Sequence, residues 1–206
     1  MSNLKKQNIT FDNIEQYSVP LEEHPLKWMF EDSEKRTISE EHKDQIFALT
    51  LEAAQLLWNM EALFKIFGKD FFEKKYFKAN EEFISSGKSD KELKKRLFNL
   101  GIPYSHKVFV SIQPQWGFVM TWKIVIKNFD ALFLGNNQTI WDKTLNWGLA
   151  YDHNDVFYFG KNRIHDSNIE AERIANNKKI VKAIIEEIEK NKNTPREKFF
   201  QNPYFK

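Results

Sequence analysis

Residues 116–163 read WGFVMTWKIVIKNFDALFLGNNQTIWDKTLNWGLAYDHNDVFYFGKNR, and this stretch decides the fold that the sequence predicts. Across 118–127 the apolar side chains recur with period two, a pattern that is typical of a β-strand. One face of that strand would carry Phe118, Met120, Trp122, Ile124 and Ile126. The opposite face is half polar, as expected where one side of a sheet is less buried. We therefore predict a strand over 118–127.

Shorter β-forming runs lie on both sides of this strand. They span residues 107–113, 131–134, 139–142, 147–151 and 156–160. The turn at Gly135, Asn136 and Asn137 consists of residues that tolerate positive φ. Because the connections are short, neighbouring strands should pair antiparallel. The sequence thus predicts an antiparallel β-meander over about 107–160.

The region before the meander has a helical period. Apolar residues recur with helical spacing at Ile46, Leu49, Ala53, Leu56, Leu57, Met60, Phe64 and Phe67. Farther on, Ser89 and Glu92 have the spacing of a capping box, and Gly101 followed by Pro103 is a common helix end. We therefore predict a helical part over 37–101.

The two ends of the chain have different patterns. Residues 1–36 lack a clean period and contain Pro20 and Pro25, so we expect an irregular arm. A second capping box at 167–170 opens a long predicted helix over 167–192. The tail, 193–206, ends in a cluster of aromatic residues that we expect to dock on the rest of the fold.

These elements together predict the fold class. We expect an α+β fold in a single domain of residues 1–206, with N-terminal helices, a central antiparallel β-meander (about 107–160) and a long C-terminal helix packed on the sheet. A chain of this length buries roughly 70% of the surface that its unfolded form exposes. Such a core requires neither disulfides nor a structural metal.

The composition excludes several classes of function. The chain has no cysteine, which excludes disulfides, thiolate nucleophiles and Cys-ligated metal centres. Its 31 basic and 29 acidic residues are nearly balanced, which disfavours a nucleic-acid partner. No apolar run approaches the roughly 18–20 residues of a membrane span, and the N-terminus lacks the apolar core of a secretory signal. We expect a cytoplasmic protein with no membrane partner.

The densest polar region, residues 152–166, contains the candidates for chemistry. His153, Asp155, His165 and Asp166 are residue types that ligate metals or transfer protons. However, the strand predicted at 156–160 separates the two histidines by roughly 17 Å, whereas metal ligands converge within about 2 Å of one ion. The simpler interpretation is a polar hairpin turn at 152–155, because such side chains hydrogen-bond the local backbone.

Other catalytic and nucleotide-binding patterns are absent from the sequence. There is no Gly-x-Ser-x-Gly elbow, and the Gly-Lys pairs at 68–69 and 87–88 lack the upstream glycine of a phosphate-binding loop. Trp122 and Lys123 alternate on a strand as in single-strand binders, but they would point to opposite faces. We predict no catalytic residue, no metal ligand and no cofactor.

A recognition surface is the remaining hypothesis. Trp, Tyr and Arg are enriched at binding hot spots, and several lie on or beside the last predicted strands. The candidate partner-binding residues are Trp141, Asp142, Trp147, Tyr151, Asp152, His153, Asp155 and Arg163. The alternative interpretation places them in the core and at the edge of the sheet.

One segment has a familiar pattern. Trp147-x-x-x-Tyr151-Asp152-His153-x-Asp155-x-x-x-Phe159-Gly160 resembles small uncharacterised bacterial α+β families, domains of unknown function, some of which are grouped with immunity proteins of polymorphic toxin systems. The stretch HPLKWMFED is similar to a bacterial domain of the same kind.

The resemblance implies a non-enzymatic protein-binding module of the immunity or antitoxin type, with a toxin-like protein as partner. It carries over no catalytic residue and leaves the oligomeric state open. The alternative function is a hydrolase-like or metal-dependent enzyme that uses the region 152–166.

Overall fold

The computed structural model describes residues 8–31, 37–64, 72, 75–133 and 137–168, together with the single positions 171, 175, 179 and 182. The chain divides into two units, residues 1–164 and residues 165–206. The sheet and the helices that connect its strands all belong to the first unit.

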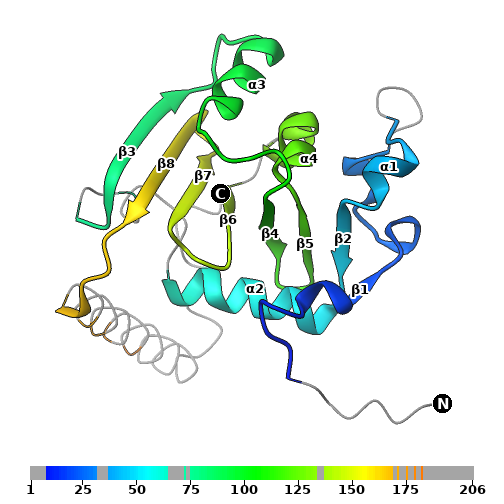
Figure 1. Cartoon of the computed structure of the whole chain (residues 1–206), viewed down its shortest axis with the longest axis horizontal. Helices are drawn as coiled ribbons and strands as arrows, with labels where there is room; N and C mark the ends of the chain where they lie inside the picture. Colours follow the sequence, from blue (N-terminus) through cyan, green and yellow to red (C-terminus); the bar gives the residue numbers. More distant parts are fainter. Residues whose placement is uncertain are drawn as a thin grey trace, which may run out of the picture. The chain divides into compact units, whose positions relative to one another are not determined.

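An eight-stranded antiparallel sheet organises the first unit (Figure 1). Its strands are β1 (Ser18–Val19), β2 (Ile46–Leu49), β3 (Phe77–Ile84), β4 (Lys107–Gln113), β5 (Trp116–Thr121), β6 (Gln138–Trp141), β7 (Trp147–Asp152) and β8 (Val156–Arg163). Their spatial order is β1-β2-β5-β4-β6-β7-β8-β3, and every neighbouring pair is antiparallel. The short strand β1 and the eight-residue strand β3 are therefore the edges of the described sheet.

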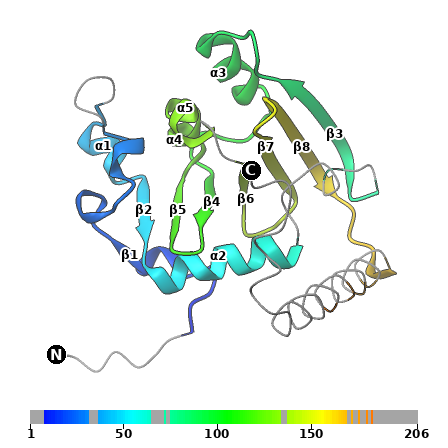
Figure 2. The same ribbon diagram turned by 180° about the vertical axis from the view of Figure 1, so that it is seen from behind.

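Short helices connect these strands. The described helices are α1 (Glu40–Lys43), α2 (Leu51–Phe64), α3 (Asp90–Phe98), α4 (Trp122–Lys127) and α5 (Phe129–Phe133), with 3-10 turns η1 (Ile14–Gln16), η2 (Leu21–Glu23) and η3 (Lys27–Met29). In Figures 1 and 2, α2 runs across the strands, and it contacts both β4 and β5.

Both faces of the sheet are buried, because alternate residues of the central strands enter two separate cores. Val108 and Val110 of β4 belong to the core that α3, α4 and α5 cover, whereas Phe109 between them belongs to the core under α2. The same alternation continues through β5, β6 and β7. A sheet that is covered on both faces has strands that read as nearly continuous apolar runs.

The predicted fold class was wrong, because the described chain is mainly an eight-stranded antiparallel sheet and not a set of N-terminal helices followed by a β-meander. In the sheet β6 pairs with β4 and not with β5, and the largest difference lies in the N-terminal half. The region 37–101, expected to be helical, contains β2 and β3 as well as α2 and α3. β2 pairs with β1 and β5, so the helical spacing of Ile46 and Leu49 was coincidental. A short apolar run fits a strand and a helix equally well, and here the pairing partners decide between them.

The strand predicted over 118–127 was half right. β5 covers its first part, but the chain turns into α4 at Trp122. The first amides of that helix donate to loop carbonyls, with Trp122 N 2.8 Å from His106 O and Lys123 N 3.0 Å from Tyr104 O. Trp122, Ile124, Val125 and Ile126 are all buried, so this helix lacks the polar stripe that would have distinguished it from a strand.

The predicted strand at 131–134 was also wrong, because residues 131–133 belong to helix α5. The other strands of the predicted meander are confirmed as β4, β6, β7 and β8. Of the predicted helix over 167–192, the described positions 167, 168, 171, 175, 179 and 182 are helical. The rest of that helix, its predicted packing on the sheet and the tail over 193–206 lie outside the described residues.

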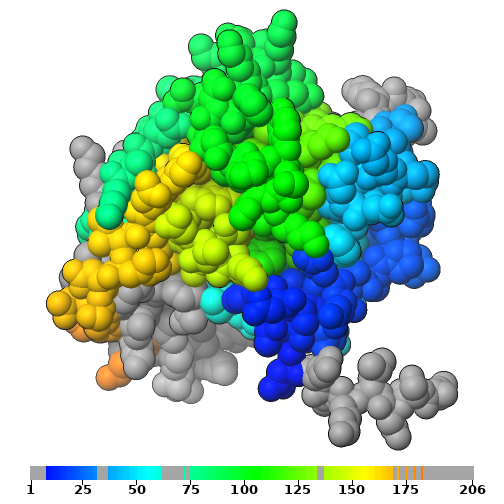
Figure 3. All heavy atoms as spheres, viewed as in Figure 1, coloured from blue at the N-terminus to red at the C-terminus, as the bar shows by residue number. Residues whose placement is uncertain are grey.

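At the β3 edge, β8 and β3 lie side by side along their whole paired length (Figure 3). Phe77 at the start of β3 covers Gly160 of β8, where an added Cβ atom would lie 2.5 Å from the ring. After Gly160, Asn162 has a φ of 60°. This edge carries the hollow that we consider next.

Candidate recognition groove

The structure buries most of the residues that the sequence marks for partner binding. Trp141, Asp142, Trp147, Tyr151 and Arg163 are all buried. Trp141 packs against Phe109 in the core under α2, and Trp147 packs against Trp122 in the opposite core. These two indole rings therefore contribute to stability from opposite faces of the sheet.

Asp142 is the centre of a buried hydrogen-bond network. Its carboxylate accepts hydrogen bonds from Trp147 Nε1 at 2.8 Å and from the Thr144 backbone N and Oγ1 at 2.9 and 2.6 Å. His106 Nε2 lies 2.7 Å from Asp142 Oδ2. With four groups on one carboxylate, Asp142 holds the loop after β6 in place, and sequence inspection did not identify His106 as its partner.

The turn between β7 and β8 is built by hydrogen bonds within the turn and by a bond to Asn137, which precedes β6. Asp152 Oδ1 accepts from the Asn154 backbone N at 2.9 Å, and the His153 backbone N donates to Asn137 Oδ1 at 2.9 Å. Asp155 has a φ of 63°, a conformation that Asp tolerates better than most residues. These contacts fit the interpretation of 152–155 as a polar hairpin turn.

The two histidines of the region 152–166 lie on either side of β8. His153 precedes the strand and His165 follows it, so the strand's full length separates them. Among the residues that the structure describes, no three His, Cys, Asp or Glu side chains are grouped to hold a metal ion. The geometry of the described part thus brings no metal-ligand set together here.

Two of the predicted residues do share a site. The Tyr151 hydroxyl donates to Asp155 Oδ1 at 2.7 Å, and burial raises the pKa of Tyr151, with the Asp155 carboxylate adding to the rise. The backbone of Asp155 accepts from Ser85 N at 2.8 Å and from Ser85 Oγ at 3.1 Å. These bonds fasten the β7–β8 turn to the segment that joins β3 to α3.

That joining segment fixes the position of α3 beside the sheet edge. Gly87 adopts a φ of +74°, which favours glycine. Ser89 then caps α3 reciprocally with Glu92, as the sequence predicted. Leu93 and Leu97 anchor the helix in the core that also contains α4 and α5.

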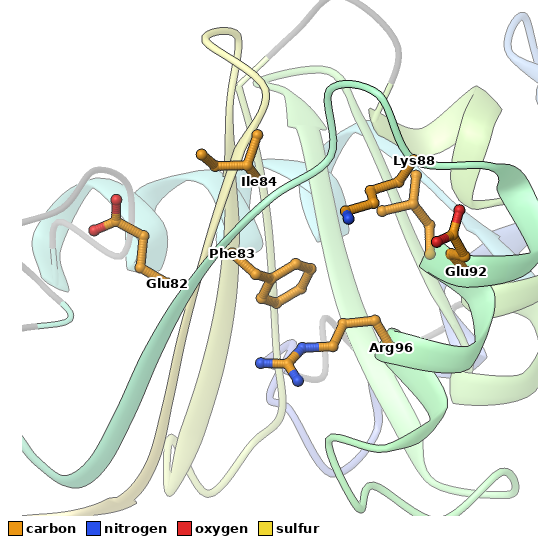
Figure 4. A pocket seen from close by; sticks show the side chains of 7 residues that line it. Glu82, Phe83, Ile84, Lys88, Glu92 and Arg96 are labelled. Atoms are coloured by element: carbon orange, nitrogen blue, oxygen red, sulfur yellow. The ribbon is translucent and has the colours of Figure 1, made fainter.

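A groove of about 540 Å³ lies between β3 and α3. Its lining consists of Glu82, Phe83, Ile84, Lys88, Glu92, Leu93 and Arg96. In Figure 4 the Phe83 ring and the Arg96 side chain point toward one another across it. The Arg96 guanidinium carbon lies 5.2 Å from the ring centroid, and Arg96 also pairs with Glu81 at 3.0 Å.

A second hollow of about 210 Å³ adjoins this groove at Leu93, which lines both. Its other walls are Ser85, Ser86, Asp90, Phe129, Asp130, Phe133, Tyr151, Asp155 and Phe157. We refer to the two hollows together as the β3–α3 groove. Tyr151 and Asp155 thus belong to its smaller end.

Sequence inspection missed the β3 wall of this groove because it placed residues 77–84 in the predicted helical part over 37–101. A usable signal was present, since FISSGKSD contains Gly87 and a capping serine immediately after an aromatic run. The sequence also gave no sign that α5 would meet the β7–β8 turn.

Glu61 of α2 is a second group that sequence inspection passed over. It is 6% exposed and lies against β4 and β6, where it accepts a hydrogen bond from the Thr139 hydroxyl. Burial raises the pKa of Glu61 to about 7, while the Ser111 hydroxyl opposes the rise. Glu61 follows the buried Leu57 by four positions, so the two side chains share one face of the helix. This spacing was the signal in the sequence for a buried charge.

Comparison with protein-family models, with curated proteins and with solved structures produced no match for this chain. Among the described helices, none is both long and apolar enough to cross a membrane. The geometry of the groove therefore carries the functional argument.

Proposed function

We propose that this chain is a non-enzymatic protein-recognition module that binds a segment of a partner protein in the β3–α3 groove. The observation that carries the proposal is the position of a groove with apolar and charged walls directly beside an edge strand. A sheet edge offers backbone donors and acceptors to an added strand, and pockets beside it select side chains.

β3 is suited to such pairing by its length. Within the described residues, β8 is its only strand neighbour, and its eight residues contrast with the two of β1 at the opposite edge. A sheet edge of this length is usually either covered by another part of the protein or used to pair with another strand, because the backbone groups of an edge strand can bind such a strand.

The groove surface has the composition of a binding site. Ile84 is 58% exposed, although isoleucine is among the residues most often buried. Phe83 and Arg96 stack beside it, and both aromatic residues and arginine are enriched in interfaces. An occupant that covered these side chains would remove apolar surface from water, at about 25 cal/mol per Å².

The resemblance of the segment from Trp147 to Gly160 to immunity families favours a toxin-like protein as the partner. Tyr151 and Asp155 from that segment line the groove, so the resemblance and the geometry point to the same place. Two other members of the predicted site lie at the same place, the half-buried Asp152 at the end of β7 and the exposed His153 in the β7–β8 turn.

The test compares two matched substitutions in affinity capture from the native cell. Ile84→Glu places a charge in the groove, and Leu51→Glu places the same charge at another exposed apolar residue, on α2. A protein captured in stoichiometric amount by the unaltered chain should be lost with Ile84→Glu and retained with Leu51→Glu. Equal capture by both variants, or no captured protein across repeated cross-linked preparations, would refute the proposal.

A further inference from the structure

We propose that the smaller end of the β3–α3 groove binds a cationic side chain, an arginine or a lysine of the bound segment. This inference rests on the proposed function, because it specifies the chemistry of the segment that the groove receives. We refer to this end, about 210 Å³ in volume, as the anchor pocket.

The charge of the anchor pocket selects the sign of its occupant. Asp90 and Asp155 line it, and among the described residues its lining contains no lysine or arginine. The larger end of the groove differs, since two carboxylates there are balanced by Lys88 and Arg96. Charge complementarity therefore places a cationic side chain of the bound segment in the anchor pocket. The part of the segment beside β3 would be neutral or carry charges of both signs.

The walls between these carboxylates are aromatic. The Phe133 ring packs edge-on against Phe157 at 5.0 Å between centroids, and Tyr151 packs against Phe157 at 4.8 Å. Aromatic faces attract ammonium and guanidinium groups, and the attraction strengthens where water is excluded. A site with aromatic walls and carboxylates thus favours an organic cation, which has an apolar stem, over a hydrated metal ion.

The chain already pairs cations with aromatic rings on this side. Lys94 Nζ lies 5.5 Å from the Phe129 centroid, next to the anchor pocket, and Arg96 covers Phe83 in the larger hollow. These internal pairs place cationic side chains of the chain itself against the rings around α3.

Asp155 is held in place to receive such a group. One carboxylate oxygen accepts the Tyr151 hydroxyl, and the Asp155 backbone is bonded to Ser85. A carboxylate fixed by neighbours loses little conformational entropy when a ligand binds, which favours affinity. Pockets for whole small molecules occupy roughly 300–1,000 Å³, so the size of the anchor pocket suits a single side chain.

The test titrates the full-length chain with N-acetyl-arginine methylamide and with its neutral citrulline counterpart, observed by backbone amide NMR. The arginine compound should give saturable shifts at Ser85, Asp90 and Asp155, and the citrulline compound should not. This comparison uses the unaltered protein, so it does not depend on any variant folding. Equal binding of the two compounds, or absence of saturation with arginine, would overturn the inference.

Paired substitutions locate the effect. Asp90→Asn with Asp155→Asn should weaken arginine binding about tenfold, because each partly exposed ion pair contributes modestly. Asn also tolerates the positive φ of residue 155. The control, Asp44→Asn with Glu52→Gln, removes the same charge at exposed positions outside the pocket and should leave binding unchanged. An equal loss in both pairs would contradict a defined pocket.

The same variants separate the two proposals. Suppose that Ile84→Glu abolishes partner capture while the Asp90 and Asp155 pair of substitutions leaves it intact. Partner binding in the β3–α3 groove is then supported, and the cationic anchor is refuted. If arginine binds as expected but Ile84→Glu leaves capture unchanged, the proposed function fails at the groove while the pocket's preference for cations stands.

Discussion

At the scale of single residues, the described part of the chain contains a buried acid, Glu61, whose charge is costly. Glu61 lies between α2 and the sheet with the Thr139 hydroxyl as its hydrogen-bond donor. An isolated glutamate releases its proton near pH 4.5, whereas buried Glu61 holds it until about pH 7. In that window the folded chain keeps a proton that the unfolded chain has lost, so stability falls as the pH rises.

Replacing Glu61 by glutamine should remove this dependence. The free energy of unfolding should match that of the unaltered chain at pH 5 and exceed it at pH 8 by about 3 kcal/mol at most, since one pKa unit corresponds to about 1.4 kcal/mol. Urea unfolding at both pH values measures the difference. Glu52→Gln, at an exposed position on the same helix, is the control and should change neither value. An unchanged pH slope in Glu61→Gln would contradict the assignment.

A second residue-scale prediction concerns Gly160. An alanine there meets the Phe77 ring, so Gly160→Ala should destabilise the fold by about 1–3 kcal/mol through overpacking. Adding Phe77→Leu should recover part of the loss by making room for the methyl group. Chemical denaturation of the single and double variants tests the coupling. Strictly additive effects would show that the ring does not restrict this position.

At the scale of elements, α3 depends on its cap, because it is short and exposed along most of one side. Ser89→Ala removes the hydrogen bond from Glu92 N and should reduce stability by about 1 kcal/mol. Ser86→Ala in the same linker is the matched control, and its effect should stay within about 0.5 kcal/mol. Thermal or urea unfolding measures both. Equal losses would mean that the linker, and not the cap, holds α3.

Elements also show where prediction from sequence succeeds. The capping box at Ser89 and the strands β7 and β8 were identified because each carries a local signal, either a cap or an alternating run between turns. β2 and α4 were misassigned because each is a short apolar segment whose type depends on distant partners. Thr121, for example, donates to the side chain of Gln45 at 2.8 Å, far away in sequence.

At the scale of the whole molecule, the described residues of both cores lie before residue 165. A chain that ends at Ile164 should therefore fold without the second unit, residues 165–206. It should unfold in one cooperative transition, followed by far-UV circular dichroism in urea, with the full-length chain as reference. A gradual transition with exposed apolar surface, detected by dye binding, would show that the first unit requires the second.

The sequence by itself determined the antiparallel pairing of β6, β7 and β8, the Asp152–Asn154 contacts of the polar turn at 152–155 and the cap of α3, because these depend on neighbours only a few residues apart. Tertiary structure alone decided that both faces of the sheet are covered, that β3 pairs with β8 at its edge, and that α3 and α5 meet the β7–β8 turn. Those contacts join residues far apart in the chain, and their free energy appears only when the strands pair and the helices pack. For the same reason, Trp141 and Trp147 entered the cores, while Tyr151 and Asp155 came to line the groove.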